Sequence, residues 1–99
     1  MSDYRAHLRQ RLYETSVPVS LHAGLIEYFV ARRPTGDFLR ACLGNDLGQA
    51  ATRADPWNRR HLGDIGCFLT YYAPSAAWGS PAAVDAWLAD PAPVPEIVE

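Results

Sequence analysis

The chain has 99 residues, of which 48% are hydrophobic and 20% are charged, values that are typical of a single folded domain. No stretch approaches the roughly 20 apolar residues of a membrane-spanning helix, and the N-terminus MSDYRAHLRQ lacks the apolar core of a signal peptide. We therefore expect one cytoplasmic domain that contacts no membrane.

Charge is distributed unevenly along the chain, although the net charge is only −2. Residues 1–60 hold all nine basic residues, which are arginines, and six acidic residues, and so carry +3. Residues 61–99 hold five acidic residues and no basic one, which gives −5. Such asymmetry can steer a partner or a second copy of the chain, whereas a dedicated nucleic-acid-binding protein usually has an overall basic excess. The same arginine content is also typical of a GC-rich genome.

Helical spacing begins near the N-terminus, and no clear strand pattern interrupts it. A first helix is expected from a cap at Ser2 to about Tyr13. Its apolar residues Tyr4, Leu8 and Leu12 form a narrow stripe, which suits a helix at the edge of a bundle.

A second helix has a broad apolar face, which suits a central position. Its end is expected at Arg32 and Arg33, because Pro34 disfavours the helical conformation in the residue before it. The apolar face comprises Leu21, Leu25, Ile26, Tyr28, Phe29 and Val30.

Two shorter helices are expected next. Thr35 can cap the first, and Gly44 is expected to end it in the left-handed conformation. Asn45 or Asp46 opens the second, which ends near Ala54. The core-facing residues of the first are Phe38, Leu39, Cys42 and Leu43.

The pairs Asp55-Pro56 and Ser80-Pro81 each join a capping side chain to a proline that suits the first helical position. They predict one helix over residues 56–72 and a last helix from residue 81. Gly63 and Gly66 lower the helix propensity of the former, which predicts close approach of a neighbouring helix. The expected buried residues of the two helices are Leu62, Ile65, Phe68, Leu69, Tyr72, Val84, Trp87 and Leu88.

These elements predict an all-α fold, a compact single-domain bundle of five to six helices joined by short loops. We assign residues 1–89 to this domain. Residues 90–99, DPAPVPEIVE, contain three prolines and are expected to form a flexible Pro-rich tail.

Few residues form a pattern with known chemistry. His61, Asp64 and Cys67 are spaced i, i+3 and i+6, and side chains six apart on a helix diverge by roughly 120°, so they do not converge on one metal ion. The nucleophile pattern GxSxG and the phosphate-binding patterns GxGxxG and GxxxxGK[ST] are absent. We expect no metal, no cofactor, no catalytic residues and no enzymatic activity. Cys42 and Cys67 are interpreted as small buried hydrophobic residues, and His7 and His22 as solvated or hydrogen-bonded.

Two arginine doublets and two tryptophans are the candidate partner-binding residues. Arg32 and Arg33 lie at the end of one helix, where they also suit the negative end of its dipole. Arg59 and Arg60 lie in the first turns of another beside Trp57, a combination that suits an acidic protein surface, a phosphate or a base. At the unfavourable end of the dipole, this second doublet is expected to be functional or to pair with an acid such as Asp55.

Trp78 lies in the segment YYAPSAAWGSP, where the prolines and glycine indicate a connection between two helices. Its indole either plugs the end of the bundle or anchors a contact with a partner, and we favour the plug.

Three segments, LHAGLIEYFVARRPTGDFL (21–39), NDLGQAATRAD (45–55) and YYAPSAAWGSP (71–81), together resemble a set of small proteins encoded in tailed-phage and prophage genomes. The resemblance covers roughly residues 20–88 and depends on the order of the motifs. It implies a phage or mobile-element origin. It assigns no catalytic activity and no functional residue.

We therefore expect a phage or prophage accessory protein of the host cytoplasm that acts by protein binding. An anti-CRISPR-like or other anti-defence inhibitor of a host protein complex fits this expectation by analogy. The alternatives are a nucleic-acid-binding regulator that uses Arg53, Arg59, Arg60 and Trp57, and a structural homo-oligomer.

Overall fold

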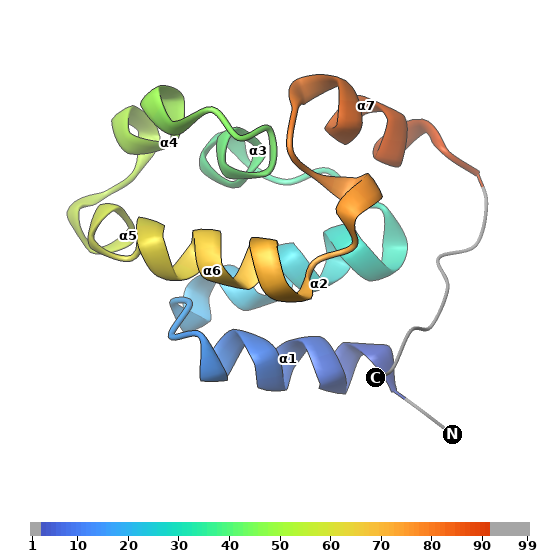
Figure 1. Cartoon of the computed structure of the whole chain (residues 1–99), viewed down its shortest axis with the longest axis horizontal. Helices are drawn as coiled ribbons and strands as arrows, with labels where there is room; N and C mark the ends of the chain where they lie inside the picture. Colours follow the sequence, from blue (N-terminus) through green and yellow to red (C-terminus); the bar gives the residue numbers. More distant parts are fainter. Residues whose placement is uncertain (1–2, 92–99) are drawn as a thin grey trace.

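The computed structural model describes residues 3–91, which form seven α-helices, two short 3₁₀ helices and no strand (Figure 1). The predicted all-α class is confirmed, but the expected number of five to six helices was too low. The elements are α1 (Tyr4–Glu14), η1 (Val19–Leu21), α2 (His22–Ala31), α3 (Asp37–Leu43), α4 (Leu47–Arg53), α5 (Pro56–Arg60), α6 (Leu62–Tyr72), η2 (Ser75–Ala77) and α7 (Pro81–Ala89). Except for its first two residues, the expected tail lies outside the described residues. Within residues 3–91, no helix combines the length and apolar character that crossing a membrane requires.

The helices surround one hydrophobic core. Helix α1 packs against α2 and α6 on one side, while α3 packs against α4, α6 and α7 on the other (Figure 1). Rings of α2 and α6 meet between these groups, with the Phe29 and Phe68 centroids 6.1 Å apart. The largest fully buried side chains are Tyr28, Phe29, Phe68, Leu8, Leu12, Leu25, Leu43, Ile65 and Val84.

The narrow stripe of α1 is buried as predicted, and the remaining faces of this helix are mostly exposed. The cap residue is Asp3, whose carboxylate accepts hydrogen bonds from the backbone N–H groups of Arg5 and Ala6 at 3.0 and 3.3 Å. The prediction of a cap at Ser2 was therefore wrong by one residue, and Ser2 itself lies outside the described residues.

The ends of α3 also differ from the prediction. Gly36 precedes the helix, and the Thr35 hydroxyl donates to the Gly36 carbonyl instead of capping. Gly44 has a φ of −77°, and Asn45 takes the left-handed conformation with a φ of 58°. Gly44 is needed for a different reason: a Cβ there would lie 3.2 Å from the Arg40 carbonyl oxygen and 3.6 Å from the Pro81 nitrogen.

Three predicted caps are confirmed. Asp46 accepts a hydrogen bond from the backbone of Gln49 at 3.1 Å. Asp55 accepts one from Asn58 at 2.7 Å, and the Ser80 hydroxyl accepts one from Ala83 at 3.0 Å. Each cap satisfies an N–H group that has no partner inside its own helix.

The predicted single helix over residues 56–72 is two helices. His61 leaves the helical conformation, with φ −103° and ψ 13°, and separates α5 from α6. The predicted close approach at Gly63 and Gly66 was wrong, because a Cβ at either position would meet nothing within 4 Å. Instead, α2 and α3 approach each other closely at Gly24, where a Cβ would lie 3.2 Å from Leu39 Cδ1.

Ion pairs partly neutralise the charge asymmetry of the sequence. Arg40 pairs with Asp85 of α7, and Arg32 Nη2 lies 3.7 Å from an Asp90 carboxylate oxygen. Acidic groups of the C-terminal third therefore lie against arginines of the first half.

Candidate protein-binding surface

The two arginine doublets lie at opposite ends of the molecule. The C-terminal end of α2 with Arg32 and Arg33 lies beside α7, whereas α5 with Arg59 and Arg60 lies at the far end of α6 (Figure 1). They therefore belong to separate surfaces, and only the second includes Trp57.

Arg32 is built into the fold. Its side chain is 11% exposed, its Nη1 donates to the Trp87 carbonyl at 2.9 Å, and its Cζ lies 3.8 Å from the centroid of the Trp87 ring. These contacts attach α7 to the end of α2. Arg33 next to it is 71% exposed and lies 3.4 Å from a Glu27 carboxylate oxygen.

Arg59 also serves the fold. Its guanidinium donates to the Ala51 and Ala54 carbonyl oxygens, both at 3.2 Å, and so binds the C-terminal end of α4. The expected pairing with Asp55 is not formed: the Arg59 guanidinium is directed to α4, and the Asp55 carboxylate accepts a hydrogen bond from the Asn58 N–H. Because α5 ends at Arg60, Arg59 lies in the last turn of its own helix, so the expected position at the unfavourable end of the dipole was wrong. Its guanidinium also satisfies carbonyls at the C-terminal end of α4.

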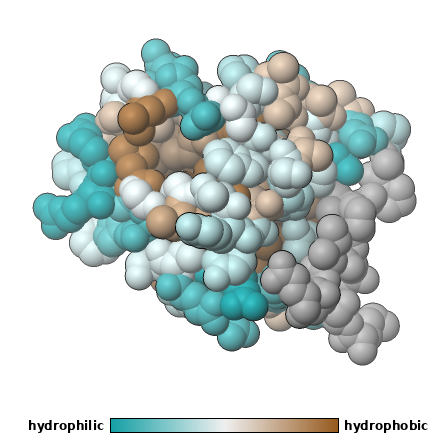
Figure 2. Space-filling model, in the orientation of Figure 1, coloured by the Kyte–Doolittle hydropathy of each residue, from teal (hydrophilic) through white to brown (hydrophobic). Residues whose placement is uncertain are grey.

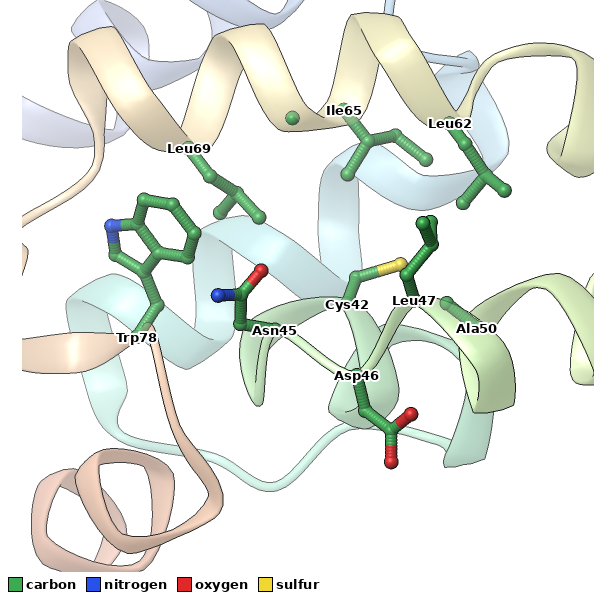
Figure 3. A pocket seen from close by; sticks show the side chains of 10 residues that line it. Cys42, Asn45, Asp46, Leu47, Ala50, Leu62, Ile65, Leu69 and Trp78 are labelled. Carbon is green, nitrogen blue, oxygen red and sulfur yellow. The ribbon is translucent and has the colours of Figure 1, made fainter.

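Trp78 lies half-buried at the edge of the core, in an apolar cleft of about 100 Å³ between α4 and α6. Figure 3 shows its indole beside Leu69, with Leu47 and Leu62 facing each other farther along the cleft. The Tyr28 hydroxyl donates to the Ala77 carbonyl at 2.6 Å, just before Trp78 in the chain. These contacts support the interpretation of Trp78 as a plug.

The two cysteines differ. Cys42 is buried, and burial raises the pKa of its thiol to about 11. Cys67 is exposed, so its predicted burial was wrong. The reason is the face that α6 presents to the core: this face carries Phe68 and Leu69, and Cys67 lies on the solvent side.

A wide hollow is lined by the end of α1, the segment after it and α5. We call it the aromatic hollow and define it by Tyr13, Val17, Val19, Trp57 and His61, with Ser16, Pro18 and Ser20 between them. Its volume is about 500 Å³. Tyr13, Val19 and Trp57 are 58%, 62% and 56% exposed, although all three are large hydrophobic side chains.

Sequence reasoning found Trp57 but missed Tyr13 and Val19. Tyr13 follows Leu12 directly and so points away from the buried stripe of α1, which was the available signal for an exposed aromatic side chain. Val19 lies in the segment that was interpreted only as a helix break. The hollow combines α1, η1 and α5, and no local pattern predicts that combination.

The wall of the hollow between α1 and α2 is held in one conformation. Ser16 is left-handed with a φ of 61°, and the Val17 N–H donates back to the Leu12 carbonyl at 3.1 Å. The buried His22 ring places Nε2 2.8 Å from the Val17 carbonyl oxygen, and Tyr13 meets the same ring edge-on at 4.8 Å. A wall fixed in this way loses little conformational entropy when a partner binds.

His61 closes the other side of the hollow. Its ring lies 4.7 Å from the Trp57 ring, and its Nδ1 lies 2.8 Å from an Asp64 carboxylate oxygen. Within residues 3–91, no three His, Cys, Asp or Glu side chains are grouped closely enough to hold a metal ion. His61 contacts both Trp57 and Asp64.

Figure 2 shows the surface in the orientation of Figure 1, with a hydrophobic recess over α4 and α6 where the Trp78 cleft opens. Leu47, which is 71% exposed, lines this recess. Comparison with family models, with curated proteins and with solved structures found no match to this chain. The arrangement of its own side chains is therefore the basis for a functional proposal.

Proposed function

We propose that this protein acts by binding another protein, and that the aromatic hollow is the surface it uses. The observation that carries this proposal is the position of its exposed apolar side chains. Within residues 3–91, five large hydrophobic side chains are exposed, and three of them line this hollow. Tyrosine and tryptophan side chains are enriched among the residues that contribute most to the affinity of protein interfaces.

The geometry favours a protein partner over a nucleic acid. The nucleic-acid alternative requires Arg53, Arg59 and Arg60 on one basic surface. Arg53 lies 3.3 Å from an Asp37 carboxylate oxygen, and Arg59 is bound to carbonyl groups of α4. Binding of a nucleic acid depends mainly on neutralising several phosphates, and most of this arginine set is already engaged.

The finer part of the proposal concerns the partner. We propose a phage or prophage accessory protein that binds a host protein complex, as an anti-CRISPR-like or other anti-defence inhibitor would. The support is the resemblance in the order of three sequence segments, together with a mode of action that needs only a binding surface. A structural homo-oligomer would use the same hollow for a second copy of the chain.

The test is co-purification from a lysogenic or infected host with tagged variants. Trp57→Ala combined with Val19→Asp removes the apolar surface, and Tyr71→Ala is the matched control, because Tyr71 is 72% exposed and lies at the other end of α6. We expect a host protein to co-purify with the wild type and with the control, but not with the double variant.

Equal recovery of every protein with all three baits would refute a role for the hollow. Recovery of the chain itself as the only Trp57-dependent species would favour the homo-oligomer. A host defence complex as that species would support the inhibitor proposal, and a host complex without a defence role would contradict it.

A further inference from the structure

We infer that the partner presents an acidic segment with a large apolar side chain to the aromatic hollow. This inference depends on the proposed protein-binding function and specifies the chemistry of the partner. It comes from two arginines, Arg9 and Arg60, which lie on the two helices that contribute Tyr13 and Trp57 to the hollow.

Arg9 lies on α1 one helical turn before Tyr13. Residues four apart on a helix share a face, and the Tyr13 side chain leans back towards the preceding turn. Arg9 is exposed, and its side chain makes no hydrogen bond or ion pair with any residue in the range 3–91. Its guanidinium is therefore available on the same face of α1 as Tyr13.

Arg60 is a neighbour of Trp57 on α5. It lies three residues after Trp57, at a spacing that places the two side chains next to each other on the helix surface. Arg60 is exposed, and its side chain likewise forms no ion pair or hydrogen bond with the described part of the chain. The α1 and α5 edges of the hollow thus each carry one unpaired positive charge.

The acidic groups nearby already have partners. The Glu14 carboxylate accepts from Arg11 at 2.7 Å, and the Asp64 carboxylate contacts His61 at 2.8 Å. Asp55 is hydrogen-bonded as the cap of α5. These hydrogen bonds leave the negative charges of Asp55 and Asp64 in place, but the exposed charged side chains here without any partner among the described residues are those of Arg9 and Arg60. Complementarity to these two positive charges favours a negatively charged segment even though the chain as a whole carries −2.

The walls of the hollow indicate that the partner segment also carries a large apolar side chain. Val19 supplies exposed aliphatic surface, with the buried Val17 and Pro18 behind it, and the volume of about 500 Å³ has room for more than one large side chain. Trp57 and Tyr13 remain 56% and 58% exposed, so each ring can contact an apolar anchor of the partner. An acidic peptide segment with an aliphatic or aromatic anchor fits this surface.

The experiment is selection of a random peptide library on the immobilised wild-type chain, with counter-selection on the Trp57→Ala variant. We expect the Trp57-dependent peptides to carry aspartate or glutamate beside a large apolar residue. Trp57-dependent peptides without an acidic excess would overturn this inference and leave the protein-binding function intact. A library that yields no Trp57-dependent peptide would count against that function and, with it, this inference.

Charge reversal provides the second measurement. The Arg9→Glu and Arg60→Glu double variant should bind the selected acidic peptides at least about tenfold more weakly, because like charges then meet. Arg33→Glu is the matched control, and its affinity should stay within about twofold because that residue lies at the opposite end of the molecule. Circular dichroism checks that each variant is folded. Unchanged affinity in a folded double variant would overturn the inference.

Single-stranded oligothymidylate serves as the competing probe. If it displaces the acidic peptides and binds more tightly than they do at physiological salt, the surface recognises nucleic acid and the inference is wrong. If the peptides stay bound in excess oligonucleotide, the protein partner is supported.

Discussion

The guanidinium of Arg32 lies over the indole of Trp87, with Cζ 3.8 Å from the ring centroid, and also donates to the Trp87 backbone carbonyl at 2.9 Å. The Trp87 indole N–H in turn donates to the Tyr28 carbonyl at 2.9 Å. Arg32 and Trp87, which are 55 positions apart in the sequence, thus share two contacts, and the hydrogen bond to Tyr28 adds a third between α2 and α7. The sequence suggested a binding site at Arg32 and Arg33. In the structure, Arg32 instead attaches α7 to the end of α2.

Replacing Arg32 should therefore reduce stability. Arg32→Ala removes a charged hydrogen bond and a partly desolvated cation–π contact, and we expect the free energy of unfolding to fall by about 2 kcal/mol. Arg32→Lys should recover little of this loss, since an ammonium group lacks the planar fork. Urea unfolding measures the change. Arg33→Ala is the control and should stay within about 0.5 kcal/mol of wild type; a similar loss in both variants would contradict this account.

Tyr28 makes the stability sensitive to alkaline pH. Burial raises the pKa of its phenol to about 12, from an ordinary value of 10.0. The folded chain therefore keeps the proton while the unfolded chain releases it, so stability is complete below about pH 10 and falls as pH rises towards 12. The Tyr28→Phe variant should be less stable at neutral pH, because the Ala77 carbonyl loses its hydrogen-bond donor. Its stability should, however, fall less steeply between these two pH values. Chemical denaturation across this pH range gives the slope of the free energy of unfolding against pH for the wild type and for the variant. Equal slopes would rule out the assignment to Tyr28.

Replacing glycine with alanine at three positions should change the stability in opposite directions. Gly63→Ala and Gly66→Ala place a methyl group in open space on a helix, and each should raise stability by about 0.5 kcal/mol. Gly44→Ala places one against the Arg40 carbonyl and Pro81, and should lower stability by about 1–3 kcal/mol. Thermal unfolding compares the three. A stabilised Gly44→Ala variant would show that α3 and α7 are farther apart than described.

Trp78 should behave as part of the core. Because the indole is only partly buried, we expect Trp78→Ala to cost about 2 kcal/mol, less than a fully buried tryptophan. Trp57→Ala is the matched comparison, since that indole is 56% exposed, and it should change the melting temperature little. The reverse order of the two melting temperatures would make Trp78 the exposed anchor and Trp57 the plug.

Local patterns in the sequence predicted the helical class and several helix ends. Asp55-Pro56 and Ser80-Pro81 predicted two starts, because a cap and a proline act within one turn. The same local reasoning failed at Gly44, where the glycine is required by contact with Pro81 and not by its own backbone conformation. It also failed at His61, where a break in the helix leaves the apolar spacing almost unchanged.

The candidate surface was less accessible from sequence. Trp57 was found because it lies beside an arginine doublet, but Arg59 of that doublet binds α4 and Arg60 remains exposed. Tyr13 and Val19 join Trp57 only through the packing of α1, η1 and α5. A hollow formed by segments far apart in the chain leaves no spacing that a sequence pattern can show.

Photo-crosslinking in living host cells tests the central claim most directly. A benzophenone amino acid at Val19 lies in the aromatic hollow, and the same group at Tyr71 is an equally exposed control at the other end of α6. We predict a discrete crosslinked protein from position 19 that is absent from position 71 and is lost when Trp57→Ala is added. Crosslinks that are equal at both positions, or that are absent at position 19, would contradict the assignment of the hollow as a protein-binding surface.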